Sequence, residues 1–201
     1  TIPNGWKTSM KYFLKQVVNK FFGILTWPLY VLFCIHKRWA GGRRALSSIT
    51  QACAIVPGMT GEWFRRGVLQ WVTGAPLQNC CLGYGAIFSD PRVRIGEGVY
   101  IGPRSDIGYA SIGRDCILGS GVHIVSGQHQ HLFSDQETPI RDQGGVFSQI
   151  TIGPDTWVGN AAVVAADIGG GCVIGAGSVV IKPIPARSVA AGNPARVLRS
   201  R

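Results

Sequence analysis

Residues 95–124 read IGEGVYIGPRSDIGYASIGRDCILGSGVHI. Small aliphatic residues recur in this stretch, mostly six positions apart, and most are followed by glycine. A period of six matches neither the two-residue alternation of a strand nor the 3.6-residue turn of a helix, so it describes a larger repeating unit. Three short strands joined by tight corners form such a unit, with one aliphatic side chain pointing inward on each side. The stretch therefore predicts a solenoid of stacked coils.

The six-residue repeat continues to residue 180. We expect four regular coils, preceded by an irregular coil over residues 77–93, with glycine supplying unusual backbone angles at the corners. A β-sandwich with glycine-rich turns is the alternative, but irregular strands would not keep a six-residue register for so long. The inward positions are Ile95, Ile101 and Ile107; Ile112, Leu118 and Ile124; Ile152, Val158 and Val164; and Ile168, Ile174 and Val180.

Four segments of this region resemble the hexapeptide-repeat acyltransferases, most of all the branch of maltose, galactoside and polysaccharide O-acetyltransferases. The resemblance covers about residues 80–199 and is most specific after Gly175. It implies a mainly β fold, a left-handed parallel β-helix, together with a homotrimer and acetyl-CoA as the acyl donor. The segments are IGEGVYIGPRSDIG (95–108), IGRDCILGSGVHI (112–124), IGPDTWVGNAAVV (152–164) and VIGAGSVVIKPIPARSVAAGNPARVLR (173–199).

Residues 1–75 differ from the body over residues 76–201, because they are basic and apolar. They hold ten Lys and Arg against one acid, Glu62, whereas the body is nearly neutral.

Residues 21–35, FFGILTWPLYVLFCI, carry no charge, and Pro28 should kink or break a helix there. A helix of that length covers roughly 22 Å, less than a ~30 Å hydrocarbon core. Basic residues flank the run at Lys7, Lys11, Lys15, Lys20, Lys37, Arg38, Arg43 and Arg44, and the aromatic residues Trp6, Trp27, Tyr30 and Trp39 suit a headgroup layer.

These features predict N-terminal helices associated with a membrane. We expect a helix–Pro–helix element that enters one leaflet and returns, or lies in the interface, with both ends on the cytoplasmic side of the inner (cell) membrane. A signal peptide fits less well, because charged residues rather than small ones follow the apolar run. A helix packed on the protein's own core is the other alternative. Residues 62–72 predict an amphipathic helix lying on a membrane or against the body.

The distribution of charge and cysteine excludes other classes. Because the positive charge is confined to one end of the chain, no nucleic-acid partner is expected. The six cysteines include no Cys-x-x-Cys pair, so we interpret them as reduced, small apolar residues in a reducing compartment.

An inserted loop, residues 126–149, interrupts the repeat, and a long excursion from a rigid solenoid predicts a functional site. The resemblance implies that His129 is the general base that takes a proton from an acceptor hydroxyl. His131 either orients substrate, donates to an oxyanion or only lines the loop, and His123 is structural. Some hexapeptide-solenoid carbonic anhydrases bind zinc through residues of separate coils, but these three histidines crowd into nine residues. No metal is therefore expected.

The rest of the loop offers hydrogen-bonding groups that suit a sugar, although a solvated loop is an equal alternative for each of Asp135, Glu137, Arg141 and Asp142. The resembling enzymes commonly carry an asparagine facing the acceptor in an earlier coil, where this chain has Gly102. That departure leaves the identity of the acceptor open.

The resemblance also implies a groove for the acyl donor. Trp157 would border the pantetheine arm, and Gly159, Gly177 and Ser178 would offer backbone N–H groups to its amides. In the C-terminal tail, residues 182–201, Lys182 would lie near the phosphates of coenzyme A, and Arg196 and Arg199 would contact the nucleotide and phosphate. The threonine usual before that lysine is Ile181 here, which removes one hydroxyl contact.

Together these features predict a membrane-associated, acetyl-CoA-dependent O-acetyltransferase. Its acceptor would be a hydroxyl of a glycan or a lipid-linked sugar at the cytoplasmic face of the membrane, to which residues 1–75 would hold the enzyme as a monotopic or peripheral protein. N-acetylation of an amino sugar and a non-catalytic trimeric scaffold docked on membranes are the alternatives.

Overall fold

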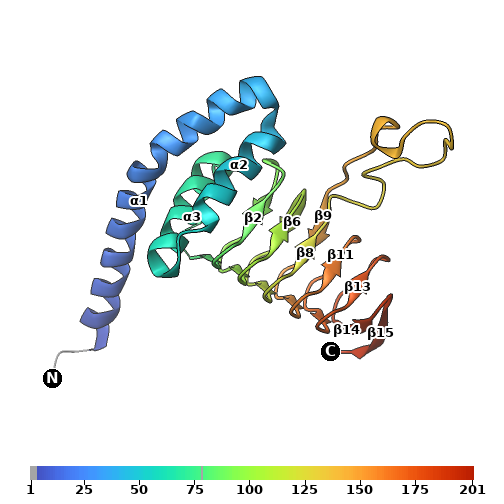
Figure 1. Ribbon diagram of the computed structural model, residues 1–201. Coiled ribbons are helices and arrows are strands. Elements are labelled where there is room, and N and C mark those ends of the chain that lie inside the picture. Colours follow the sequence, from blue (N-terminus) through green and yellow to red (C-terminus); the bar gives the residue numbers. More distant parts are fainter. Residues whose placement is uncertain (1–3, 78) are drawn as a thin grey trace.

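The body of the chain is a stack of coils built from very short strands (Figure 1). The computed structural model describes residues 4–77 and 79–201, with side chains from residue 13 onward. The strands are β1 (Cys81–Leu82), β2 (Ile87–Phe88), β3 (Arg94–Ile95), β4 (Tyr100–Ile101), β5 (Asp106–Ile107), β6 (Ala110–Ile112), β7 (Ile117–Leu118), β8 (His123–Ile124), β9 (Ile150–Ile152), β10 (Trp157–Val158), β11 (Val163–Val164), β12 (Val173–Ile174), β13 (Val179–Val180), β14 (Ser188–Gly192) and β15 (Ala195–Ser200).

These strands form three sheets, one on each side of the solenoid. Face A has the order β1-β4-β7-β10-β12-β14-β15, face B the order β13-β11-β8-β5-β2, and face C the order β3-β6-β9. Neighbouring strands are parallel except β14 and β15, which form an antiparallel hairpin at the C-terminal end. Isolated bridges at Ile168 and Ile184 extend face C. The chain is thus a parallel β-helix.

The inward positions of the repeat are those that the sequence predicts. All twelve aliphatic side chains are buried, the most exposed being Ile95 at 7%. The first coil, expected to be irregular over residues 77–93, keeps the repeat on faces A and B, because Leu82 and Phe88 are also buried and pair in register with Ile101 and Ile107. Its irregularity follows Phe88, where seven residues rather than six lead to Ile95.

The glycines have a different role from the one expected. Those that follow the inward aliphatic residues have ordinary backbone angles, but they lie against the next coil: a Cβ on Gly159 would come within 2.5 Å of the backbone nitrogen of Ala176. Positive φ occurs instead three residues after the inward residue on faces A and C, as at Gly177. Half of those ten corners carry other residues: Arg104, Asp115, Asp155, Ala161 and Arg187.

Three helices, α1 (Asn4–Ala40), α2 (Gly42–Ala54) and α3 (Gly58–Thr73), cover the N-terminal end of the solenoid (Figure 1). Leu46 of α2 and Leu69 of α3 belong to the same buried cluster as Leu82 and Phe88 of the first coil. The amphipathic helix expected over residues 62–72 therefore packs against the body.

Two arginines of α3 are buried where the first coil would leave carbonyl oxygens without partners. Arg65 donates to the carbonyl oxygens of Leu82 (2.9 Å), Val56 (2.9 Å) and Cys53 (3.3 Å). Arg66 donates to the carbonyl oxygen of Cys80 at 3.1 Å and lies 3.6 Å from Glu62. A solenoid end exposes backbone acceptors, and buried acceptors need donors. These two side chains supply them.

Helix α1 is continuous over 37 residues, about 55 Å, with Pro28 inside it. Its axis changes direction near the middle (Figure 1), as expected where proline removes a backbone donor. The helix–Pro–helix element expected around residues 21–35 is part of one continuous helix that ends only at Ala40, and its place in a membrane stays a prediction. The side chains of Trp6, Lys7 and Lys11, which the sequence assigns to a membrane surface, lie outside the described set.

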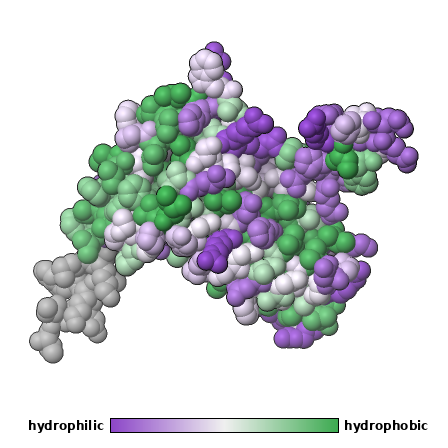
Figure 2. Space-filling model, in the orientation of Figure 1, coloured by the Kyte–Doolittle hydropathy of each residue, from purple (hydrophilic) through white to green (hydrophobic). Residues whose placement is uncertain are grey.

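One side of α1 packs on the other helices, and the opposite side is exposed. Phe22 and Phe33 are buried, and the Phe22 ring lies 5.1 Å from Trp63 and 5.3 Å from Phe64. Residues mostly three or four apart form an exposed apolar stripe, here called the outer stripe, and Figure 2 shows hydrophobic surface over the helical end. It comprises Leu14, Val17, Phe21, Ile24, Leu25, Leu32, Ile35 and Trp39.

By length and composition alone, residues 13–40 would suffice to cross a membrane, with a mean hydropathy of 1.5 over 18 residues. Only 17% of that stretch is buried. A helix enclosed in a protein core would have most of this surface covered, whereas the described residues cover only one side of α1.

Candidate active site

The inserted loop leaves the solenoid at the end of β8 and returns at β9, at the corner between faces B and C (Figure 1). His129 and His131 lie in its first turn, and both side chains are exposed. The carbonyl oxygen of His129 accepts a 2.7 Å hydrogen bond from the backbone N–H of Val146, which ties the outgoing and returning arms together. His129 is therefore held on a closed loop base with its imidazole open to solvent.

Gln128, which the sequence analysis missed, fixes the start of this loop. Its side-chain amide donates to the carbonyl oxygens of Ile181 (2.6 Å) and Ala165 (3.3 Å), which follow the next two strands of face B. Ile181 precedes Lys182, so this contact joins the residue before the predicted base to the residue before the predicted phosphate-binding lysine. A glutamine immediately before the histidine is the only signal in the sequence, and its role depends on contacts with later coils.

The polar residues farther along the loop mainly stabilise the loop itself. Asp135 accepts hydrogen bonds from the hydroxyl of Thr138 (2.6 Å) and the backbone N–H of Glu137 (2.9 Å), and these bonds hold the pKa of its carboxyl below the usual value. Arg141 and Asp142 pair with each other at 3.4 Å within the short helix η1 (Ile140–Asp142). For Asp135, the solvated-loop alternative is the better description.

His123 projects outward from face B, in register with Asp106 of the preceding coil. Burial raises the pKa of the Asp106 carboxyl, and the nearby His123 opposes that shift. Within residues 4–77 and 79–201, no group of three His, Cys, Asp or Glu residues is arranged to hold a metal ion.

Three of the predicted donor-binding residues share face A. Trp157 is 53% exposed, and its register partners across the sheet are Val173, then Val189, then Arg199. Arg196 lies on the same hairpin strand, opposite Ala191. Three strand spacings of ~4.8 Å put Trp157 and Arg199 roughly 14 Å apart. The row thus joins an exposed aromatic ring to two exposed guanidinium groups, which suits a long donor with a phosphate-bearing end.

The expectation that Gly159, Gly177 and Ser178 offer free backbone N–H groups is wrong. The N–H of Gly159 donates to Ile174 and that of Gly177 to Asn160, both at 2.8 Å, and the N–H of Ser178 donates to Gly175 at 3.3 Å. The Ser178 hydroxyl is buried and accepts from the backbone N–H of Gly192. Hydrogen bonds between neighbouring coils use these backbone N–H groups. The glycines therefore contribute only the space that a side chain would otherwise fill at this corner.

A single chain does not bring all the predicted residues together. His129 and Lys182 follow strands of face B and lie at the corner toward face C, whereas Gly159 and Gly177 follow strands of face A and Trp157 lies on face A itself. The base and the donor row are therefore on different sides of one solenoid.

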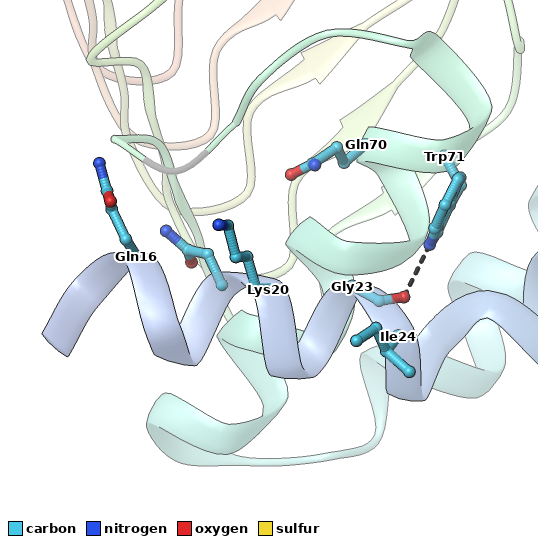
Figure 3. Close-up of a pocket in the computed structure, with 7 residues that line it drawn as sticks. Gln16, Lys20, Gly23, Ile24, Gln70 and Trp71 are labelled. Carbon is cyan, nitrogen blue, oxygen red and sulfur yellow. Dashed lines mark hydrogen bonds between the residues drawn. The ribbon is translucent and has the colours of Figure 1, made fainter. Parts of the chain in front are cut away.

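Another groove lies away from the loop, between α1 and α3 (Figure 3). It has a volume of about 560 Å³, and the indole of Trp71 donates to the carbonyl oxygen of Gly23 at one end. Gln16 and Lys20 of α1 and Gln70 of α3 line it. It contains neither predicted histidine, so it is separate from the loop base.

Comparison with known proteins identifies the family. A sequence profile described as "Bacterial transferase hexapeptide (six repeats)" matches residues 92–126. WbbJ of Escherichia coli strain K12, named for O-acetyl transfer in lipopolysaccharide biosynthesis, is 32% identical over 136 residues, covering 64% of this chain and 68% of WbbJ. The chain belongs to the hexapeptide-repeat acetyltransferase family.

Other relatives match over shorter parts of their own length. The galactoside O-acetyltransferase of Escherichia coli is 36% identical over 116 residues, which is 56% of this chain and 46% of that protein. A relative from Mycobacterium tuberculosis, named for acetyl transfer, is 33% identical over 55% of this chain and 45% of its own. The chain thus spans about half the length of these two curated relatives.

Solved structures share the fold. A maltose O-acetyltransferase from Clostridium difficile 630 superposes with a TM-score of 0.69 at 24% identity, covering 79% of this chain and 85% of that one. A galactoside acetyltransferase in complex with coenzyme A gives a TM-score of 0.59 at 25% identity, covering 79% and 80%. These neighbours imply that the parallel β-helix is left-handed.

Proposed function

We propose that this protein is an acetyl-CoA-dependent O-acetyltransferase that modifies a hydroxyl of a glycan or glycolipid precursor. The carrying observation is His129 at the loop base, directly after Gln128, whose amide is hydrogen-bonded to the residue before Lys182, in a chain that belongs to an acetyltransferase family. The exposed row from Trp157 to Arg199 fits a donor with phosphates at one end. The neighbour solved with coenzyme A supports that donor.

In this proposal, His129 removes the proton of the acceptor hydroxyl while the oxygen attacks the thioester carbonyl carbon of acetyl-CoA. The tetrahedral species then collapses, the carbon–sulfur bond breaks, and the imidazolium returns its proton to the departing thiolate. No covalent enzyme intermediate is needed when both substrates are held together, so the rate gain comes from positioning and proton transfer.

The separation of His129 from the exposed row of Trp157, Arg196 and Arg199 on face A supports a homotrimer. A donor lying along face A of one subunit needs a base from another surface, and the solenoid offers its face B–face C corner. A cyclic assembly that sets this corner of one subunit against face A of its neighbour would create three equivalent sites.

The outer stripe of α1 supports attachment to the cytoplasmic face of the cell membrane, as a monotopic or peripheral protein. Ile24 is 75% exposed and Trp39 is 87% exposed, whereas exposed Lys37 and Arg38 flank the apolar face. Apolar side chains would enter the acyl region of the membrane while basic groups contact anionic headgroups.

The test is turnover by the full-length protein in lipid nanodiscs. Acetyl-CoA is supplied with a panel of glycans and lipid-linked sugars, and released coenzyme A is measured with a thiol reagent. We expect an acetylated product whose acetyl group is removed by hydroxylamine, since an ester is cleaved and an amide is not. A hydroxylamine-resistant product would indicate N-acetylation, and an intact trimer without turnover on any acceptor would indicate a scaffold.

A further inference from the structure

A second cavity lies beside the inserted loop, where the loop base meets the start of α2. Its volume is about 370 Å³. We call it the arginine pocket, and its lining residues are Arg43, Arg44, Ser47, Ser89, Ser126, Gln130 and Phe147.

The arginine pocket has a cationic lining with no carboxylate in it. The guanidinium of Arg43 stacks over the Phe147 ring at 3.5 Å, and among the described residues neither Arg43 nor Arg44 has a side-chain acceptor within hydrogen-bond distance. Asp90, which lines a neighbouring cavity together with Arg43 and Arg44, is fully buried and engaged by Arg92 at 2.7 and 2.9 Å. Burial opposes the charge on Asp90, but the hydrogen bonds from Arg92 and the nearby charges of Arg92 and Arg43 hold the pKa of its carboxyl below the usual value. Arg43 is partly compensated by the charge of Asp90, so Arg44 retains the greater binding capacity for an anion.

The arginine pocket adjoins the proposed base. Gln130 follows His129 directly, and Phe147 follows Val146, which donates to the carbonyl oxygen of His129. The opposite wall comes from α2, which begins two residues after the end of α1. A ligand in this pocket would thus extend between the catalytic loop and the basic end of the outer stripe.

We infer that the arginine pocket binds a phosphate or diphosphate group of the acceptor. Guanidinium groups match phosphate oxygens in charge and in bidentate geometry, and the serine hydroxyls add donors. A neutral sugar would need acceptors as well as donors. The inference rests on the proposed function and narrows the acceptor to a sugar linked through phosphate to a carrier. The nearby outer stripe favours a lipid carrier over a nucleotide.

The first experiment measures binding without catalysis. Inorganic pyrophosphate is titrated calorimetrically into full-length protein in nanodiscs made of neutral lipid, with Arg44→Gln, Arg44→Lys and Arg114→Gln in parallel. Arg114 is exposed and lies at another corner, so its variant matches the change in charge. We expect Arg44→Gln to weaken binding at least tenfold, Arg44→Lys to restore part of it, and Arg114→Gln to have no effect. No binding to the wild type, or equal binding by Arg44→Gln and Arg114→Gln, would overturn the inference.

The second experiment uses three acceptors that share one sugar: lipid diphosphate-linked, nucleotide diphosphate-linked and unphosphorylated. Arg44→Gln should raise KM at least tenfold for the phosphorylated acceptors while leaving their kcat and the KM for acetyl-CoA unchanged. Preference for the lipid or the nucleotide form identifies the carrier. An equal rise in KM for the unphosphorylated sugar in Arg44→Gln, or no rise for the phosphorylated acceptors, would refute the phosphate contact. Absence of transfer from every acceptor, with pyrophosphate binding intact, would refute the proposed function alone.

Discussion

Side chains are buried for different reasons in the solenoid and in the helices at its N-terminal end. In the solenoid, each coil supplies the partner surface for the next, so a place in the repeat determines whether a side chain is inside. In the helices, burial depends on what the neighbouring element offers. Arg65 is buried because the first coil presents carbonyl oxygens, whereas Phe21 and Ile24 are exposed although both are apolar. The hydrophobic pattern alone therefore predicts which side chains are buried in the solenoid, but it does not predict this in the helices.

The sharpest test of the comparison uses two histidines, one inside the repeat and one in the loop that interrupts it. His129→Ala should lower kcat by ~10²–10⁴-fold, because it removes the proposed general base. His123→Ala, at a regular outward position of β8, should retain near-wild-type turnover. Both variants should bind acetyl-CoA normally. Equal losses in the two variants, or none in either, would remove the loop from the mechanism.

The outer stripe provides the next largest effect. Phe21→Asp combined with Ile24→Asp should reduce partitioning into anionic vesicles about 10³-fold, because each large apolar side chain contributes roughly 2 kcal/mol when buried in lipid. High salt should leave the wild type bound, since buried apolar area is not screened. The matched control is Phe133→Asp combined with Ile140→Asp, two exposed apolar residues of the inserted loop. Equal release by both pairs would show that α1 is not the anchor.

The same contrast explains which features can be predicted from the sequence. The inward positions from Ile95 to Val180 follow from the period, and the inserted loop follows from its interruption. The pairing of Gln128 with Ile181 and the contact of Arg43 with Phe147 join segments 53 and 104 residues apart, and no local pattern encodes them. Gly159 shows a further limit of prediction from sequence, because a neighbouring coil requires glycine there rather than the backbone angles of Gly159 itself.

The buried arginine of α3 tests whether the helices are part of the body. Arg65→Met should lower the free energy of unfolding by about 3 kcal/mol, because it leaves the carbonyl oxygens of Leu82 and Val56 without this donor and removes one of the donors to that of Cys53. The control is Arg94→Met, at an exposed position of β3, which should change stability by less than ~0.5 kcal/mol. Urea unfolding in detergent measures both. Equal midpoints would mean that α3 is detached from the solenoid in solution.

The smallest effects compare one substitution, glycine to alanine, in the two regions. Gly159→Ala should destabilise the protein by about 1–3 kcal/mol, because its Cβ would meet the Ala176 nitrogen at 2.5 Å and the coils cannot separate locally. Gly23→Ala should stabilise it by up to ~1 kcal/mol, since nothing lies within 4 Å of that Cβ and alanine favours the helix. The backbone carbonyl that accepts from Trp71 is unchanged by this substitution. Thermal unfolding of the two variants gives the signs directly. Stabilisation by both would mean that the coils are looser than a 2.5 Å approach allows, and destabilisation by both would mean that α1 is not helical at Gly23 in solution.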